Sequence, residues 1–377
     1  MNPIFSRTLK VLCTAVAAAM LSACGGASST VKPLTEFVTP SIAGSRVIAF
    51  GDSFSDVGQT GCARYTVNDG GADGSMTLAE RLASNFGFTT MTPVHSGVLS
   101  GGAYSYAYGG ATITGGGVMS VSAQIDAFVD AGNQLTENDL VIITAGSQDI
   151  VNSAMTYYAS GRSAADATVA KDALVTAASN LVTKVKRLTD EAHAKHVLVI
   201  APVNVARTPW GLSQGANYPS SSANYTFLER LSVALEGDNS MSSFGSQLSL
   251  KLGAEYPPVS SGLKVLLSDL SSYFNLMTGT APGGTFTYPT GSLNTYASYI
   301  TSAGLALTNP DVPACTLAAT SSPIVTPRTT TSCTTGTNYN TSVFADDLNL
   351  TPAANRMLAD YIFNSSGTGT MRTAGWR

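Results

Sequence analysis

Short continuous apolar runs alternate along the chain with segments in which apolar residues recur every three or four positions. Apolar runs of four to seven residues are typical of strands that are buried on both faces of a sheet. Five of them predict strands, at 47–50, 103–108, 139–145, 197–201 and 264–267. Helical spacing predicts helices that begin near 77, 121, 164 and 351. The repeated order of strand and helix predicts an α/β fold, a doubly wound and mostly parallel sheet flanked by helices.

Start signals support the first and the last of these helices. Thr77 and Glu80 have the spacing of a capping box, in which each side chain bonds the backbone of the other residue. Thr351 is the expected N-cap of the last helix, with Pro352 in its first turn. The helix that begins at 164 is expected to extend to about Ala194.

Two long stretches lie outside this alternation. Residues 210–258 have the pattern of mostly helical structure, and we expect them to cap the functional site. Residues 279–340 are rich in Thr, Ser, Gly and Pro, a composition that predicts long loops. No internal repeat is evident in the sequence.

The first 23 residues are interpreted as a cleaved secretory signal. Arg7 and Lys10 form a short basic region, and the run 11–20 that follows is apolar. This run is too short to span a bilayer as a mature helix, but its length is normal for a signal peptide.

The signal ends in a motif that predicts a lipid anchor. Residues 21–24 read Leu-Ser-Ala-Cys, which resembles the bacterial lipobox, so we expect cleavage before Cys24 and lipid on its thiol. The alternative is ordinary cleavage after Ala23 that leaves Cys24 free. Gly25 in place of aspartate favours the outer membrane, and several acyl chains together form a stable anchor. Residues 24–45, rich in small and polar residues, predict a flexible tether.

Composition fits an exported protein. Only 12% of the residues are charged, about half of the usual share. Removing Arg7 and Lys10 from the 20 basic residues leaves 18 against 24 acidic ones, a net charge near −6. No basic stripe is present in the sequence, so nucleic acid is not an expected partner.

The five cysteines have different predicted fates. Cys13 leaves with the signal and Cys24 is lipidated, so three remain in the mature chain. Cys315 and Cys333 flank a loop rich in Ser and Thr, and a disulfide between them would contribute about 3 kcal/mol in an oxidising compartment. Cys62 is then a buried thiol or a competitor for one partner. The spacings match no zinc site, so no metal and no cofactor is assigned.

The densest chemical signal follows the first predicted strand. Residues 51–58 read Gly-Asp-Ser-Phe-Ser-Asp-Val-Gly, directly after the apolar run 47–50. A turn at the carboxyl end of a buried parallel strand is where an open α/β sheet places its chemistry. The motif resembles the nucleophile block of the GDSL (SGNH) family of serine ester hydrolases, with Phe54 in place of leucine. This resemblance implies a three-layer sandwich in which Ser53 is the nucleophile.

The resemblance extends to a second block and to an altered third block. Ser53 and Gly110 match the residues whose backbone N–H groups would hold the oxyanion, although Gly110 alone also fits a simple turn. Family members read Gly-x-Asn-Asp in the third block, whereas residues 146–149 read Gly-Ser-Gln-Asp. Gln148 carries the same amide on one more methylene, so its NH₂ is expected to miss the third oxyanion position by about an ångström or more.

The fourth block lacks the expected general base. The family has Asp-x-x-His before the final helix, and here Asp346 is followed three residues later by Asn349. An amide does not titrate near neutral pH, so Asn349 cannot accept the serine proton. Asp346 or Asp347 is an open alternative as base, but a carboxylate of ordinary pKa is weak in this role.

None of the three histidines is a good replacement on sequence grounds. His196 and His193 precede a strand, at the end of the sheet opposite the chemistry, and His95 lies in a loop from which it would have to cross to the site. All three are interpreted as surface histidines.

Two functions remain open for residues 46–377, which we interpret as one domain because the outermost motifs lie near its ends. The first is a lipid-anchored carboxylesterase or lipase at the cell envelope, slow or atypical in mechanism, acting on a small-molecule or lipid ester. The second is a catalytically silent GDSL homologue that binds acyl or glycan ligands. A purely structural lipoprotein would leave the Gly-Asp-Ser block unexplained.

Overall fold

The computed structural model describes most of the region from 45 to 278 and the C-terminal helix. The described residues are 45–59, 63–68, 75–96, 102–115, 118–211, 223–232, 243–257, 264–278, 342–364, 371 and 376. Within them, six strands form one sheet in the order β2-β3-β1-β4-β5-β6, and every neighbouring pair is parallel. This confirms the predicted α/β sheet.

The strands agree with the apolar runs except at one edge. The six are β1 (Arg46–Gly51), β2 (Thr92–Pro93), β3 (Ala103–Ser105), β4 (Asp139–Thr144), β5 (His196–Ile200) and β6 (Val265–Ser268). The run predicted to extend to 108 ends as a strand at Ser105, although the Tyr106 and Tyr108 N–H groups still donate to the Ala49 and Gly51 carbonyls of β1. The edge strand β2 was not predicted, since it is two residues long and contains a proline.

The predicted helices are present, together with two further helices in the described residues that were not predicted, α4 and α9. The helices are α2 (Leu78–Asn85), α3 (Val121–Asp130), α4 (Ser147–Ala159), α5 (Ala164–Asp190), α7 (Ala223–Ser232), α8 (Phe244–Glu255), α9 (Ser271–Met277) and α11 (Pro352–Asn364), with short 3₁₀ turns η1 (Val94–Ser96) and η2 (Val205–Arg207). The capping box of Thr77 and Glu80 is confirmed. Helix α5 ends four residues earlier than expected, followed by His193 in the left-handed region at φ 62°.

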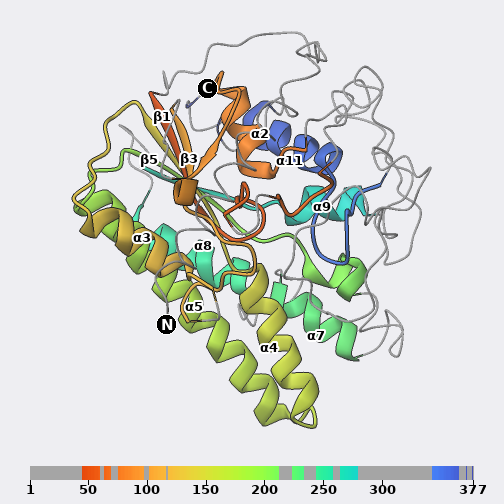
Figure 1. The fold of residues 1–377 in the computed structure, drawn as a ribbon. Coiled ribbons are helices and arrows are strands. Elements are labelled where there is room, and N and C mark those ends of the chain that lie inside the picture. Colours follow the sequence, from red (N-terminus) through yellow and green to blue (C-terminus); the bar gives the residue numbers. More distant parts are fainter. Residues whose placement is uncertain are drawn as a thin grey trace, which may run out of the picture.

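Alternate residues of the sheet face two separate apolar layers. Ile48 and Phe50 of β1 pack with α3, α4, α5 and α8, whereas Val47 and Ala49 pack with α2, α9 and α11. Figure 1 shows these two groups of helices on opposite sides of the strands. The sheet is therefore buried on both faces, as its continuous apolar runs predict.

The described part of the region 210–258 consists mainly of α7 and α8. Helix α8 packs along α5, and α7 contacts α4 and η2. Helix α8 therefore extends the layer that covers the sheet. No helix in the described ranges has both the length and the apolar composition needed to cross a membrane.

Several predictions fall on residues outside the described ranges. These are the signal 1–23, nearly all of the tether, the loops 279–340, the lipidation at Cys24, the pairing of Cys315 with Cys333 and the state of Cys62.

Candidate active site

The candidate site lies where the strand order reverses. The chain leaves β1 between β3 on one side and β4 on the other. In an open parallel sheet, the loops after such neighbouring strands diverge and leave a crevice at their carboxyl ends. Ser53 is the second residue after β1, so the structure places the predicted nucleophile at this point.

Close backbone approach shapes the turn that carries Ser53. Gly51 has φ 144°, and a Cβ on it would lie 2.2 Å from the Thr144 carbonyl oxygen of β4. The Asp52 N–H then donates to the same oxygen at 3.1 Å, and the Asp52 carbonyl accepts from Ser55 and Asp56. Ser53 is nearly buried, and no described residue hydrogen-bonds to its hydroxyl. The turn therefore fixes the backbone and leaves the hydroxyl without a hydrogen-bond partner among the described residues.

A glutamine from α3 clamps the start of this turn. Gln124 is fully buried, its Oε1 accepts the Gly51 N–H at 2.7 Å, and its Nε2 donates to the Gly51 carbonyl at 2.9 Å. The same Nε2 donates to the Met119 carbonyl at 3.0 Å. Sequence reasoning missed this residue, although a polar side chain among the inward positions of an amphipathic helix is a usable signal.

The second block lies beside the turn, and steric constraints favour glycine at both Gly109 and Gly110. Gly110 has φ 76°, a left-handed conformation that favours glycine. A Cβ on Gly109 would lie 1.9 Å from the Tyr65 ring. The Tyr108 N–H donates to the Gly51 carbonyl at 3.1 Å, which brings this segment against β1. Its conformation is explained by these contacts, and the donor role of the Gly110 N–H stays a prediction.

The third block begins helix α4, which was not predicted as a helix. Its N-cap is Gly146 at φ 111°, where a Cβ would lie 2.4 Å from the Phe244 ring. Gln148 is the second helical residue, and its Nε2 donates to Asn152 Oδ1 at 2.9 Å, one turn along the same helix. One of the two N–H donors of the predicted third oxyanion amide therefore bonds within its own helix.

The fourth block holds Asp346 and Asn349 together. Asp346 is fully buried, and its Oδ1 accepts the N–H groups of Leu348 at 2.9 Å and Asn349 at 2.7 Å. The Asn349 Nδ2 donates to both carboxylate oxygens, at 3.2 and 3.0 Å. Asn349 thus gives Asp346 the kind of N–H bond that an imidazole Nδ1–H gives in a serine hydrolase, without supplying a second nitrogen.

Two bonds bring this loop to the carboxyl edge of the sheet. The Trp210 N–H, in the segment after β5, donates to the Asp347 carbonyl at 2.9 Å. The Thr66 hydroxyl, in the segment that follows the nucleophile turn, donates to the Leu350 carbonyl at 2.8 Å. The residue next to Asn349 is therefore tied to the chain that leaves the Ser53 turn.

The three histidines lie at other places in the fold, and His196 and His95 have identified contact partners there. His196 begins β5 at the amino edge of the sheet and meets the Trp376 ring edge-on, at a centroid distance of 4.9 Å. His193 follows α5, before the same strand. His95 lies in η1 after β2, two strands from β1, where its Nδ1 is 2.8 Å from Gln59 Oε1. No histidine among the described residues hydrogen-bonds to the Ser53 hydroxyl, although His95 is near enough to Asp56 to oppose the rise that burial causes in the pKa of that carboxyl.

Two carboxylates with raised pKa values lie near the turn, the buried Asp52 and the partly exposed Asp149. Burial raises the pKa of Asp52 from 3.8 to about 6, and burial together with the nearby Asp52 raises the pKa of Asp149 to about 7. The Asp52 Oδ1 accepts the Phe54 N–H at 3.2 Å, but no described residue hydrogen-bonds to its Oδ2. The Thr144 and Ser147 hydroxyls lower this pKa slightly by their proximity, while the Thr144 hydroxyl itself donates to Ser55 Oγ at 2.8 Å.

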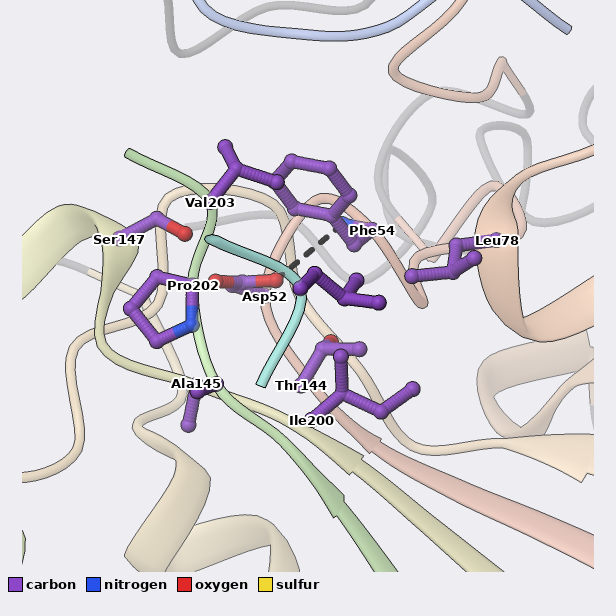
Figure 2. Close-up of a pocket in the computed structure, with 11 residues that line it drawn as sticks. Asp52, Phe54, Leu78, Thr144, Ala145, Ser147, Ile200, Pro202 and Val203 are labelled. Carbon is purple, nitrogen blue, oxygen red and sulfur yellow. Dashed lines mark hydrogen bonds between the residues drawn. The ribbon is translucent and has the colours of Figure 1, made fainter. Parts of the chain in front are cut away.

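Figure 2 shows the Asp52 carboxylate inside a small pocket beneath the turn. Its lining includes Phe54, Ala145, Ile200 and Pro202, from the ends of β1, β4 and β5, and it has room for about one water molecule. Ser53 does not line it, so the pocket is no acyl site. Among the described residues, no cluster of His, Cys, Asp or Glu is arranged to hold a metal ion.

Fold and site together define an α/β protein with a serine at the switch point of a parallel sheet. The chain belongs to the GDSL-like Lipase/Acylhydrolase family, whose sequence pattern it matches over residues 47–362. The family acts on ester substrates, which supports ester hydrolysis as the general activity. A search of curated proteins found no match. Solved structures with a match include an extracellular lipase from Streptomyces rimosus, at 15% identity and a TM-score of 0.38, covering 66% of this chain and 89% of that one.

Proposed function

We propose that this chain is a serine ester hydrolase of the cell envelope that uses Ser53 as nucleophile and works slowly because Asn349 occupies the position of the general base. The observation that carries this proposal is the bidentate contact of the Asn349 amide with Asp346. The amide supplies the N–H bond to Asp346 that a catalytic histidine would make, but it has no nitrogen that could accept the serine proton.

The proposed reaction begins with attack of Ser53 Oγ on the ester carbonyl. The Oγ–carbon bond forms, the serine proton passes to water, and the Ser53 and Gly110 N–H groups hold the oxyanion. The alkoxide then leaves with a proton from water, and a second water hydrolyses the acyl-enzyme. Gln148 would join the oxyanion donors through the N–H that does not bond Asn152, or through both after leaving Asn152.

The expected rate follows from known losses in serine hydrolases. Removing the base histidine costs about 10⁶ in turnover, while binding and the oxyanion donors still give about 10³ to 10⁴ over water. A slow enzyme is therefore consistent with an intact nucleophile turn and no imidazole.

The second candidate is a silent homologue that binds acyl or glycan ligands. It is favoured by the bond that turns the Gln148 amide toward Asn152 and by the absence, among the described residues, of a histidine hydrogen-bonded to Ser53. A fluorophosphonate reagent separates the two functions, since only a nucleophilic serine is phosphonylated. Mass spectrometry should find the adduct on Ser53 in the native protein and none in Ser53→Ala; a native protein that stays unlabelled would favour the silent homologue.

The proposed location rests on the lipobox at 21–24. Cys24→Ser should release the protein from washed membranes, and a variant that still sediments with them would contradict a lipid anchor.

The proposed disulfide between Cys315 and Cys333 would appear as one linked peptide pair in a non-reduced digest.

A further inference from the structure

The segment from Gly109 to Ile113, which carries the predicted donor Gly110, is held at both ends by carboxylates. At the first end, Asp56 Oδ2 accepts the Gly109 N–H at 2.7 Å. The other oxygen of Asp56 accepts the N–H groups of Gly58 at 2.8 Å and Gln59 at 2.7 Å. Asp56 is fully buried and lies three residues after Ser53, so one side chain joins the nucleophile turn to the Gly110 segment.

At the second end, Asp149 accepts the Ile113 N–H, with its two oxygens at 3.2 and 3.1 Å. Asp149 is the third residue of α4, next to Gln148. The Ile113 and Thr112 carbonyls in turn accept N–H groups from the start of α3, at Ser122 and Val121. The position of Gly110 is therefore set from the nucleophile turn on one side and from α4 on the other.

We propose that Asp56 and Asp149 are positioning residues that fix the Gly110 N–H relative to Ser53. Neither carboxylate is assigned a contact with substrate; each acts through the backbone of the segment between them. An oxyanion donor is effective only within about 2.7–3.1 Å of the charge that develops, and a misplacement of 1 Å costs about 10²-fold in rate. The inference rests on the proposed function, in which Ser53 and Gly110 act on an ester.

An Asp→Asn substitution is expected to have different effects at the two positions. Three N–H groups converge on both oxygens of Asp56, so in Asp56→Asn the new NH₂ must face at least one of these donors. Both oxygens of Asp149 accept the same Ile113 N–H, so the amide oxygen of Asp149→Asn keeps an acceptor for it. Asp149→Ala removes that acceptor.

The test measures kcat and KM on a nitrophenyl acetate substrate for Asp56→Asn, Asp149→Asn and Asp149→Ala, each also in an Asn349→His background to raise the signal. We expect Asp56→Asn and Asp149→Ala to lower kcat at least about tenfold with KM within about threefold. Asp149→Asn should stay within about threefold of its parent in both constants. Equal losses in Asp149→Asn and Asp149→Ala would contradict positioning through the hydrogen bond.

Asp139→Asn is the matched control. Asp139 is also a buried carboxylate that accepts a backbone N–H, from Thr136 at 2.8 Å, but it begins β4 at the opposite edge of the sheet. It should lose thermal stability with kcat unchanged. The proposal is overturned if Asp56→Asn behaves in the same way as this control.

Separate measurements distinguish failure of the proposed function from failure of the positioning roles. If neither parent hydrolyses the ester and Ser53 does not react with fluorophosphonate, the proposed function fails, and amide hydrogen exchange decides the inference. Exchange at Gly109 should then rise in Asp56→Asn, and exchange at Ile113 should rise in Asp149→Ala but not in Asp149→Asn. Unchanged exchange in all three variants would overturn the positioning roles.

Discussion

The nucleophile turn and the loop of Asp346 and Asn349 reach the same edge of the sheet, but they are held in different ways. The turn is bonded by residues distant in sequence, Gln124 from α3 and Thr144 from β4. Leu348 and Asn349, both within the same loop, donate hydrogen bonds to the Asp346 carboxylate, and the bonds from Trp210 and Thr66 reach backbone carbonyls of the loop instead.

This difference explains how a base can be absent while the site keeps its shape. Asp346 serves as the acceptor that closes a tight turn, and an asparagine satisfies it as an imidazole N–H would. Under the proposed function, an asparagine in place of the family's histidine would therefore cost the loop little, although it would remove the proton acceptor. A comparable change in the nucleophile turn would disturb bonds to the sheet and to α3.

The first prediction tests the long-range hold on the turn and has the largest expected effect on stability. Gln124→Met keeps the length of the side chain but leaves the buried Gly51 N–H without its partner, while the Gly51 carbonyl keeps the Tyr108 N–H. An unpaired buried polar group costs about 1–3 kcal/mol, so we expect the free energy of unfolding to fall by up to about 3 kcal/mol.

Chemical denaturation of Gln124→Met and of Gln134→Met would measure this loss. Gln134 is exposed and makes one 3.3 Å side-chain bond, to the Glu191 carbonyl. Its substitution should change stability by less than about 0.5 kcal/mol. Equal effects in the two variants would mean that the clamp does not stabilise the turn.

The second prediction concerns the charge beneath the turn. The pKa of Asp52 is raised from 3.8 to about 6 in the folded protein, so the folded state binds its proton more tightly than the unfolded state does. This contribution to stability is complete below pH 3.8 and is lost as pH rises through 6. Asp52→Asn stays neutral and can keep the bond from the Phe54 N–H.

We therefore expect Asp52→Asn to match the native protein at pH 4 and to exceed it at pH 8 by up to about 3 kcal/mol in the free energy of unfolding. Denaturation curves at the two pH values measure the difference. A stability difference that does not grow with pH would show that the Asp52 carboxylate is not disfavoured by burial.

The third prediction tests the local hold on the base loop and has the smallest expected effect. Asn349→Ala removes the side-chain N–H bonds to Asp346 but leaves the two backbone donors, so we expect a loss of about 1–2 kcal/mol. Thermal unfolding of Asn349→Ala beside Asn349→His measures it, and the histidine variant should lose less. If both lose stability equally, the N–H bond to Asp346 is not what holds the loop.

The contrast between local and long-range hydrogen bonds also explains which features could be predicted from the sequence. The strands of the sheet centre follow from their apolar runs, and Ser53 lies at the carboxyl end of β1 as the motif implied. Helix α4 was missed because its buried face carries Ser147, Gln148 and Ser153 instead of a continuous apolar stripe. Gln124 and Asp56 act through bonds to backbone groups far along the chain or across a turn, and a pattern of residue types does not report such partners.

The central claim is that this site has a nucleophile and a preserved loop but no base, and Asn349→His tests it most directly. A histidine there would bond Asp346 through one nitrogen and offer the other to Ser53. We expect kcat/KM on short-chain nitrophenyl esters to rise at least about tenfold over the native protein, and to collapse when Ser53→Ala is added. A native protein that is already fast, with Asn349→His equal or slower, would contradict the account and direct the search for a base to Asp347 or His95.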